Sequence, residues 1–136
     1  MHLEIAKVEV FPVKMTFSIP FSVSTFSIPT VRSHVVVVIH TDGGISGVGE
    51  AVPTPVFHEE TVESILHNIE NYYGPALIGE DPFNVEGIMD KFDRILTGNP
   101  FARAAIDFAL YDIMGKKTGL PVCMLFTKLY TVIWHG

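Results

Sequence analysis

Two histidines and one glutamate are the side chains of this sequence that are best placed to do chemistry. His34 and His40 are an even number of residues apart, so they could share one face of a strand. No carboxylate or third histidine stands at ligand spacing beside them, so we interpret them as surface or packed histidines rather than a metal pair. Glu50 ends an expected strand and could act as an acid or a base, although we favour a hydrogen-bonded structural carboxylate.

The other motifs that could carry chemistry are incomplete. Gly47 and Gly49 would belong to a dinucleotide-binding fingerprint only if a third glycine stood at position 52, where the chain has Val52 followed by Pro53. Cys123 is the only cysteine, which excludes an intrachain disulfide and a cysteine-based zinc cluster and favours a buried structural thiol. The sequence therefore predicts no catalytic residue and no metal ligand in this chain.

Composition indicates one domain with a large apolar core. The chain has 136 residues, 48% of them hydrophobic, enough for a domain that buries roughly two-thirds of its unfolded surface. Its net charge is −6 and its nine Lys and Arg are scattered, so we expect no nucleic-acid partner. The longest wholly apolar run, residues 35–39, is far short of the ~20 residues that span a bilayer. Charged residues at positions 4, 7 and 9 interrupt the N-terminus where a signal peptide would be apolar, so we expect a cytoplasmic protein with no membrane partner.

Three stretches predict an antiparallel sheet that would position these residues; they are residues 5–15, 35–40 and 45–51. Pro12 marks the first as an edge strand or as the end of a strand. Asp42-Gly43 predicts a hairpin between the other two, because it supplies the positive φ angles of a tight turn. Gly47 and Gly49 in the returning strand indicate that another backbone passes close to it.

Two proline-bearing loops, residues 18–33 and 52–58, carry apolar side chains that solvent-exposed loops usually lack. The first could be tucked back onto the core, or it could form a mobile flap that closes over a ligand. Under the second interpretation, the substrate contacts come from Phe21, Thr25, Phe26 and Ile28 in the first flap and from Val52, Thr54 and Val56 in the second.

Three helices are predicted after the sheet. Residues 59–73 and 85–96 each carry one apolar stripe, and Gly74-Pro75 would end the first of them. Residues 99–121 hold a third helix, with the side chain of Asn99 as its N-cap. That helix has one apolar stripe (Ala102, Ala105, Ile106, Ala109, Leu110, Ile113) and an apolar opposite side (Ala104, Phe108, Tyr111). The predicted fold is α+β, a three-stranded antiparallel meander followed by a bundle of three to four helices, in which the last helix needs cover on both sides.

Four motifs taken together resemble the N-terminal capping domain of the enolase superfamily. They are GGxxGxGEA (residues 43–51), TPxxxxET (54–61), LTGN (96–99) and ARAAIDFALYDIMGKKTGLPV (102–122). Within the superfamily the chain is similar to the mandelate racemase/muconate lactonizing enzyme family, and most similar to its muconate cycloisomerase and dipeptide epimerase branch. The second and third motifs are similar to those of dipeptide epimerases in particular.

The resemblance implies a two-domain Mg²⁺-dependent isomerase that removes a proton next to the carboxylate of a small substrate. Residues 1–125 would be the capping domain, and residues 126–136 the linker and first strand of a TIM-type barrel that is not in this chain. The barrel would carry the Mg²⁺ ligands and the lysine bases. The family's Lys-x-Lys does not occur here, because no two lysines are separated by one residue. We therefore expect a truncated chain that is catalytically inactive and binds no cofactor by itself.

The chain departs from the family pattern in two places. The family usually has a glycine pair and a basic, acidic sequence after position 125, where this chain reads FTKLY. Dipeptide epimerases often offer a basic residue from the first flap, where the nearest alignment places Phe26, and this implies a more apolar substrate. Two other classes stay open: a free-standing oligomeric interaction module derived from this domain, and a small enzyme that would need a convergent polar cluster. We also expect the protein to be a homo-oligomer.

Overall fold

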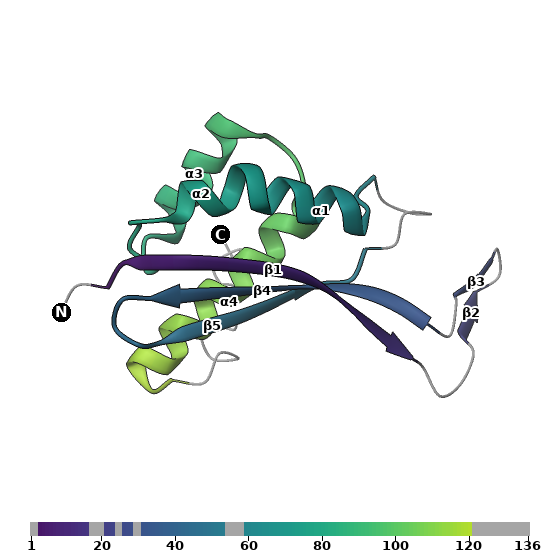
Figure 1. Ribbon diagram of the computed structural model, residues 1–136, viewed down its shortest axis with the longest axis horizontal. Coiled ribbons are helices and arrows are strands. Elements are labelled where there is room, and N and C mark those ends of the chain that lie inside the picture. Colours follow the sequence, from purple (N-terminus) through teal and green to yellow (C-terminus); the bar gives the residue numbers. More distant parts are fainter. Residues whose placement is uncertain (1–2, 17–20, 24–25, 29–30, 54–58, 121–136) are drawn as a thin grey trace, which may run out of the picture.

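The computed structural model describes residues 3–16, 21–23, 26–28, 31–53 and 59–120. Its main sheet contains the antiparallel strands β1 (Ile5–Thr16), β4 (Val31–Thr41) and β5 (Ser46–Ala51), in the order β1-β4-β5 (Figure 1). The predicted meander is confirmed. Pro12 lies in the edge strand β1, which tolerates proline because the N–H side of an edge residue can face away from the partner strand.

The stretch predicted as the first loop, residues 18–33, is partly strand. β4 already begins at Val31, which pairs with Thr16 at the end of β1. Between them, β2 (Phe21–Val23) and β3 (Phe26–Ile28) pair as a separate antiparallel ribbon. Phenylalanine, valine and isoleucine have high strand propensity, which explains why this stretch is not one irregular loop as predicted.

The first predicted helix begins later than the sequence indicated. α1 (Val62–Asn68) starts after Thr61, whose side-chain oxygen accepts a hydrogen bond from the Ser64 N–H. Ser64 Oγ in turn accepts from the Thr61 N–H, which completes a capping box. This local pairing fixes the start of the helix at Val62 rather than at residue 59, where the sequence analysis placed it.

The same helix also ends later than predicted. It runs from α1 through a π-helical turn, η1 (Ile69–Tyr73), directly into α2 (Gly74–Leu77). The wider turn carries the Gly74 N–H to the Ile69 carbonyl, and a Cβ at position 74 would lie only 2.6 Å from that oxygen. Pro75 stands in the first turn of α2, where a missing N–H is tolerated, so Gly74-Pro75 does not end the helix.

The remaining helices are α3 (Val85–Ile95) and α4 (Pro100–Thr118). The side chain predicted to cap α4 does not do so: Asn99 has a left-handed backbone (φ 58°), and its Oδ1 accepts a hydrogen bond from Asn68 instead. The cap comes from Glu60, whose two carboxylate oxygens accept the N–H groups of Phe101 and Ala102 at 2.7 and 3.0 Å. The N-cap prediction for Asn99 is therefore wrong, because a distant carboxylate satisfies the first turn.

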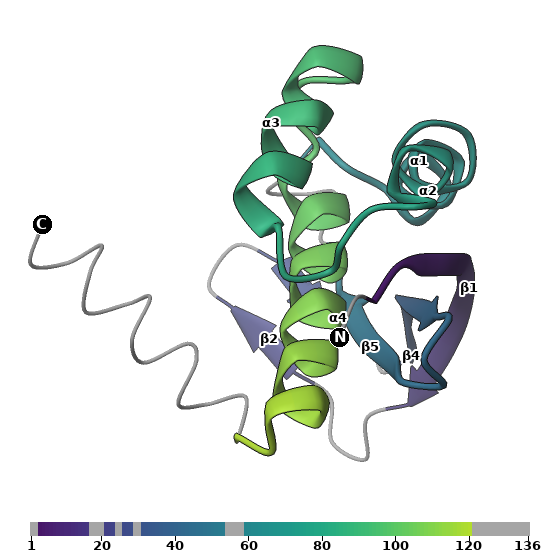
Figure 2. The same ribbon diagram turned by 90° about the vertical axis from the view of Figure 1, so that its left-hand side faces the viewer.

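α4 lies directly on β5 (Figure 2). A Cβ at Gly49 would lie 1.8 Å from the carbonyl oxygen of Ala105, and one at Gly47 would lie 2.1 Å from that of Ala109. The prediction that another backbone passes close to these two glycines is confirmed, and that backbone belongs to α4.

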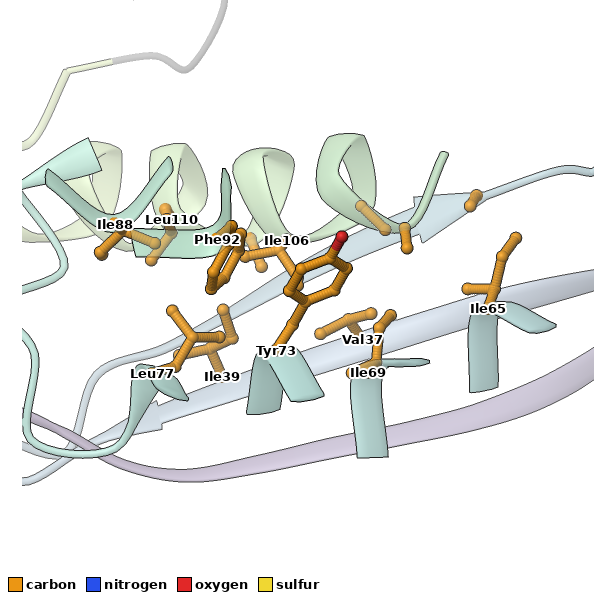
Figure 3. Close-up of a cluster of buried hydrophobic side chains, with 14 of the residues drawn as sticks. Val37, Ile39, Ile65, Ile69, Tyr73, Leu77, Ile88, Phe92, Ile106 and Leu110 are labelled. Carbon is orange, nitrogen blue, oxygen red and sulfur yellow. The ribbon is translucent and has the colours of Figure 1, made fainter. Parts of the chain in front are cut away.

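The core lies between this sheet and the helices (Figure 3). Its members include the predicted stripe of α4, all fully buried: Ala102, Ala105, Ile106, Ala109, Leu110 and Ile113. On the opposite side of α4, Phe108 is 45% exposed, and Ala104 and Tyr111 are half-buried. The described elements thus bury one side of the helix and leave the other partly open. Among these elements there is no helix with both the length and the apolar character needed to cross a membrane.

Candidate functional site

Both predicted flaps leave the sheet at the same end. The register places Thr16 at the end of β1 opposite Val31 at the start of β4, and Val35 opposite Ala51 at the end of β5. Residues 17–30 therefore connect two strands at this end, and residues 52–58 begin there. The β2–β3 ribbon projects from the same end (Figure 1). We call this region the flap end of the sheet.

The structure places four of the seven predicted flap residues. Phe21 lies in β2 and Phe26 and Ile28 lie in β3, and the ribbon register puts Phe21 opposite Ile28. Val52 follows β5 directly and is half-buried. Thr25, Thr54 and Val56 lie outside the described residues. The backbone thus brings Phe21 and Ile28 together, while the flap roles of all seven residues stay predictions.

A histidine and a carboxylate join two strands beside the flap end. His34 Nδ1 of β4 is hydrogen-bonded to Glu50 Oε1 of β5. His34 is only 8% exposed, and its Nε2 is buried without a hydrogen-bond partner among the described residues. The bond to Glu50 agrees with the hydrogen-bonded interpretation of that carboxylate. A buried Nε2 presents no solvent-accessible acid or base, so the pair acts first as a tie between the strands that lead to both flaps.

A second histidine and carboxylate pair lies at the other end of the same sheet face. His40 Nε2 is 2.6 Å from Glu9 Oε1, and His40 Nδ1 is 2.8 Å from Ser46 Oγ, so the contacts link all three strands. The hydrogen bond with His40, and then the nearby charge of Lys7, lower the pKa of the Glu9 carboxyl. The sequence showed that the two histidines could share a face, but it gave no way to pair each with a carboxylate on another strand.

The described carboxylates and histidines do not form a metal centre. Within the described ranges, no three or more His, Cys, Asp or Glu side chains gather so that they could hold a metal ion. The nearest arrangements are the two separate pairs, His34 with Glu50 and His40 with Glu9. A divalent cation such as Mg²⁺ requires several oxygen ligands, so these residues do not fit a Mg²⁺ site.

Glu60 is a positioning residue that the sequence analysis missed. It follows the second flap segment, residues 52–58, and is 6% exposed. Through its bonds to Phe101 and Ala102, Glu60 joins the described chain after that segment to the N-terminus of α4, where a negative charge is favourable. No local spacing could reveal this contact, because the partners are more than 40 residues apart along the chain.

Polar residues on α4 form hydrogen bonds with the sheet and with the neighbouring helix α3. Asp112 accepts the N–H of Val48 on the open edge of β5, and Arg103 donates to Asp93 of α3. Asp107 differs, because its Oδ1 is buried and has no hydrogen-bond partner among the described residues. Burial raises the pKa of the Asp107 carboxyl.

Comparisons with known proteins place this fold. Residues 5–126 match the family described as mandelate racemase/muconate lactonizing enzyme, N-terminal domain. The chain is 38% identical over 128 residues to an N-succinyl-L-Arg/Lys racemase of Bacillus cereus, covering 94% of this chain and 34% of that protein. It is similar, at a TM-score of 0.84 and 37% identity, to the dipeptide epimerase of Enterococcus faecalis V583, whose crystal structure contains Mg and the dipeptide L-Leu-L-Tyr; 90% of this chain and 34% of that chain are covered. A muconate lactonizing enzyme from Pseudomonas fluorescens gives the same TM-score at 29% identity, with 92% of this chain and 34% of that chain covered. The chain thus spans about a third of the length of these relatives.

Proposed function

This chain belongs to the mandelate racemase/muconate lactonizing enzyme family, as its N-terminal domain, and from that premise we propose that it is the substrate-specificity lid of a Mg²⁺-dependent enolase-superfamily enzyme. The complete enzyme would remove a proton next to the carboxylate of a small substrate, as a muconate cycloisomerase or a dipeptide epimerase type of enzyme. We also propose that it acts in the cytoplasm, on the sequence grounds given above.

The observation that carries this proposal is that both predicted flaps leave the sheet at the same end. The strand register brings residues 17–30 and 52–58 to the same end of one sheet, although they are separated in the sequence by β4 and β5. The His34–Glu50 bond ties β4 to β5 at that end, and Glu60 anchors the far side of the second segment to α4. A pair of segments rooted on rigid strands in this way is suited to closing over a ligand held by another domain.

We assign the lining of the closed lid to the predicted flap residues: Phe21, Thr25, Phe26, Ile28, Val52, Thr54 and Val56. Apolar side chains at most of these positions would exclude water and contact an apolar part of the substrate. Phe26 in the place of a basic residue favours an uncharged substrate side chain. The name of the Enterococcus faecalis relative, a hydrophobic dipeptide epimerase that is 37% identical to this chain, is consistent with that preference.

We assign Mg²⁺ and the proton-abstracting groups to the barrel domain of the complete enzyme. The metal there would stabilise the negative charge that develops on the substrate carboxylate when the neighbouring carbon loses its proton. The described residues of this chain offer no cluster of metal ligands, so its own part is to orient the substrate and keep water out.

The first experiment asks whether the 136-residue chain has activity of its own. We expect no racemisation of dipeptides or N-succinyl amino acids and no cycloisomerisation of muconate by the purified chain with Mg²⁺ present. Calorimetry with Mg²⁺ should show no specific binding. Turnover above the rate without protein would contradict the proposal and favour a small enzyme in its own right.

The second experiment tests the lid directly by exchange of domains. The chain would replace the N-terminal domain of the Enterococcus faecalis dipeptide epimerase, and the chimera would be assayed with L-Leu-L-Tyr. We expect Phe26→Ala to raise the KM of the chimera for this apolar dipeptide by about tenfold, the scale of one lost apolar contact. Phe83→Ala, at a 40% exposed residue beside α3, is the matched control and should leave KM unchanged. Equal effects of the two changes would argue against a flap role for Phe26.

A free-standing interaction module is the second candidate, and exposed apolar side chains favour it. Phe11, Val48 and Phe108 are 41%, 49% and 45% exposed. Such a module would form a discrete oligomer that covers apolar surface without binding metal. An active chimera would favour the lid, whereas an inactive chimera together with a stable oligomer of the 136-residue chain that covers Val48 and Phe108 would favour the module.

A further inference from the structure

A groove of about 590 Å³ runs along the outer edge of the sheet. One wall is β1 from Ala6 to Phe11, and the other is formed by Ile69 and Glu70 of η1, Gly74 and Pro75 of α2, and Ile78. Figure 1 shows this edge strand passing beside the helix formed by α1 and α2. The groove therefore combines a mostly apolar helical wall with a strand edge that no other strand of the main sheet covers.

The open part of this edge is short and has defined limits. At one limit the loop after α2 closes the edge, because the Ile5 N–H donates to the Glu80 carbonyl at 2.9 Å and the Ile5 carbonyl accepts from the Gly79 N–H at 2.8 Å. At the other limit stands Pro12, which has no N–H to offer. Between these limits no other described strand pairs with this side of β1, and strand addition begins at such an edge.

The orientation of the backbone groups follows from Pro12. In an antiparallel pair, alternate residues direct their N–H and C=O groups to the partner strand, and the others direct them away. Pro12 pairs with Val35 and can donate nothing to it, so it belongs to the outward set. Counting back by two, Val10 and Val8 also direct their N–H groups toward the groove.

The charges beside Val8 indicate what kind of strand fits. Lys7 and Glu9 lie on the outer face of the sheet, opposite His40 and Val38, with side chains 67% and 44% exposed. If β1 met β1 of a second copy around a two-fold axis at Val8, each Lys7 would stand opposite Glu9 of the other copy. A pairing centred on Glu9 would instead oppose two like charges, which is destabilising. The same axis places Ala6, which lies at the register shift between Ile5 and Lys7, opposite Val10 at the limit of the open part of the edge.

We propose that the open edge of β1 is a self-association site, in which two copies of this chain pair their β1 strands antiparallel around Val8. The two sheets then become one continuous sheet, and Val8 of each copy exchanges both of its backbone hydrogen bonds with the other. Ile78, which is 49% exposed at the rim of the groove, comes close to the second copy. The window is short, and strand twist turns the rest of the partner strand out of the plane. This association goes beyond the lid function and does not depend on it.

Charge exchange on the 136-residue chain tests the proposal. Sedimentation equilibrium of the native chain should show a monomer–dimer equilibrium. Lys7→Glu leaves only carboxylates at the two positions, and Glu9→Lys leaves only ammonium groups, so each variant alone should raise the dimer dissociation constant by about tenfold or more. An equimolar mixture of the two should restore dimers of near-native affinity, because opposite charges then face each other in the mixed pair. Lys14→Glu, the same change on β1 outside the window, is the control and should leave the dimer unchanged.

A backbone variant makes the test independent of charge. Val8→Pro removes an N–H that the β1–β4 ladder does not use, so the monomer should keep its circular dichroism spectrum while the dimer is lost. A chain that stays monomeric at every concentration would overturn the proposal. A dimer that tolerates Val8→Pro, or a mixture of the two charge variants that fails to restore dimers, would overturn it as well.

Discussion

The two faces of the main sheet use the same strands in different ways. On β4, Val35, Val37 and Ile39 face the helices and are fully buried, whereas Val36 and Val38 on the other face are only half-buried. On β5 the contrast is sharper, because two of the inner positions are glycines in contact with α4 and the outer Val48 is 49% exposed. The inner face is thus specified by shape, while the outer face mixes half-buried and exposed valines with the two histidine and carboxylate pairs. The inner face therefore determines how this chain folds, whereas the outer face is the one that can contact other molecules.

The largest expected effect breaks the inner face. Gly49→Ala puts a Cβ 1.8 Å from the Ala105 carbonyl oxygen, so α4 must move away from β5. We expect the free energy of unfolding to fall by about 3 kcal/mol or more, as measured by urea denaturation. Val48→Ala, at the neighbouring position on the outer face, should cost less than about 1 kcal/mol. If the two changes lower the free energy of unfolding equally, the contact with the Ala105 carbonyl is not what requires glycine at position 49.

The next effect concerns the cap that holds α4 over the inner face. Glu60→Gln keeps the shape of a buried side chain but removes the charge that accepts the Phe101 and Ala102 N–H groups. We expect a loss of about 1–2 kcal/mol in the free energy of unfolding, the usual scale for a helix cap. The exposed neighbour Glu59→Gln is the control and should have little effect. Equal effects of the two changes on the free energy of unfolding would mean that water can replace the Glu60 carboxylate as the partner of these two N–H groups.

The inner face could be predicted from the sequence because its causes are local. Alternating side chains predicted the meander, and Gly47 and Gly49 predicted the close approach of another backbone, which the structure identifies as that of α4. The stripe of α4 followed from helical periodicity in the same way. Each of these sequence signals comes from residues that are near one another in the chain, although the helix that contacts the two glycines lies much later in the sequence.

The features that could not be predicted depend on distant partners. Glu60 caps a helix that begins 40 residues later, and Glu50 meets His34 through the pairing of two strands. Asn99 showed the local pattern of a cap, but its left-handed backbone and the competing Glu60 overrode that pattern. The extent of β4 was missed because serine, threonine and proline between residues 18 and 33 concealed strand-forming residues. At the flap end, the sequence identified the two flap segments, and the strand register then showed that both leave the same end of the sheet.

Asp107 lies on α4, and its effect on the free energy of unfolding can be measured in the isolated chain. Burial raises its pKa, so the folded state prefers the neutral acid; the stability it contributes is present below the unfolded pKa of about 3.9 and is lost as pH rises through the folded value. Asp107→Asn should therefore raise the free energy of unfolding near neutral pH by about 1 kcal/mol or less, and the gain should vanish in acid. Asp112→Asn should act in the opposite direction, because Asp112 accepts the Val48 N–H. A chimera with a barrel that supplies a donor to Asp107 should lose the gain.

The smallest expected effect lies on the outer face, at the Glu9–His40 pair. The bond with His40, and then the charge of Lys7, lower the pKa of Glu9, so its contribution to stability is present above the unfolded pKa of about 4.3 and is lost as pH falls through the folded value. Glu9→Gln should make the unfolding temperature less sensitive to acid over this range. Because His40 is the main cause, the same change in a His40→Ala background should have a smaller effect, which a double-mutant cycle followed by thermal unfolding would measure. Since Glu9 also stands opposite Lys7 of the second copy in the proposed dimer, the cycle should be measured at protein concentrations where the chain is monomeric. A cycle with no coupling would mean that the Glu9–His40 bond adds no stability to the sheet beyond what the inner face already supplies.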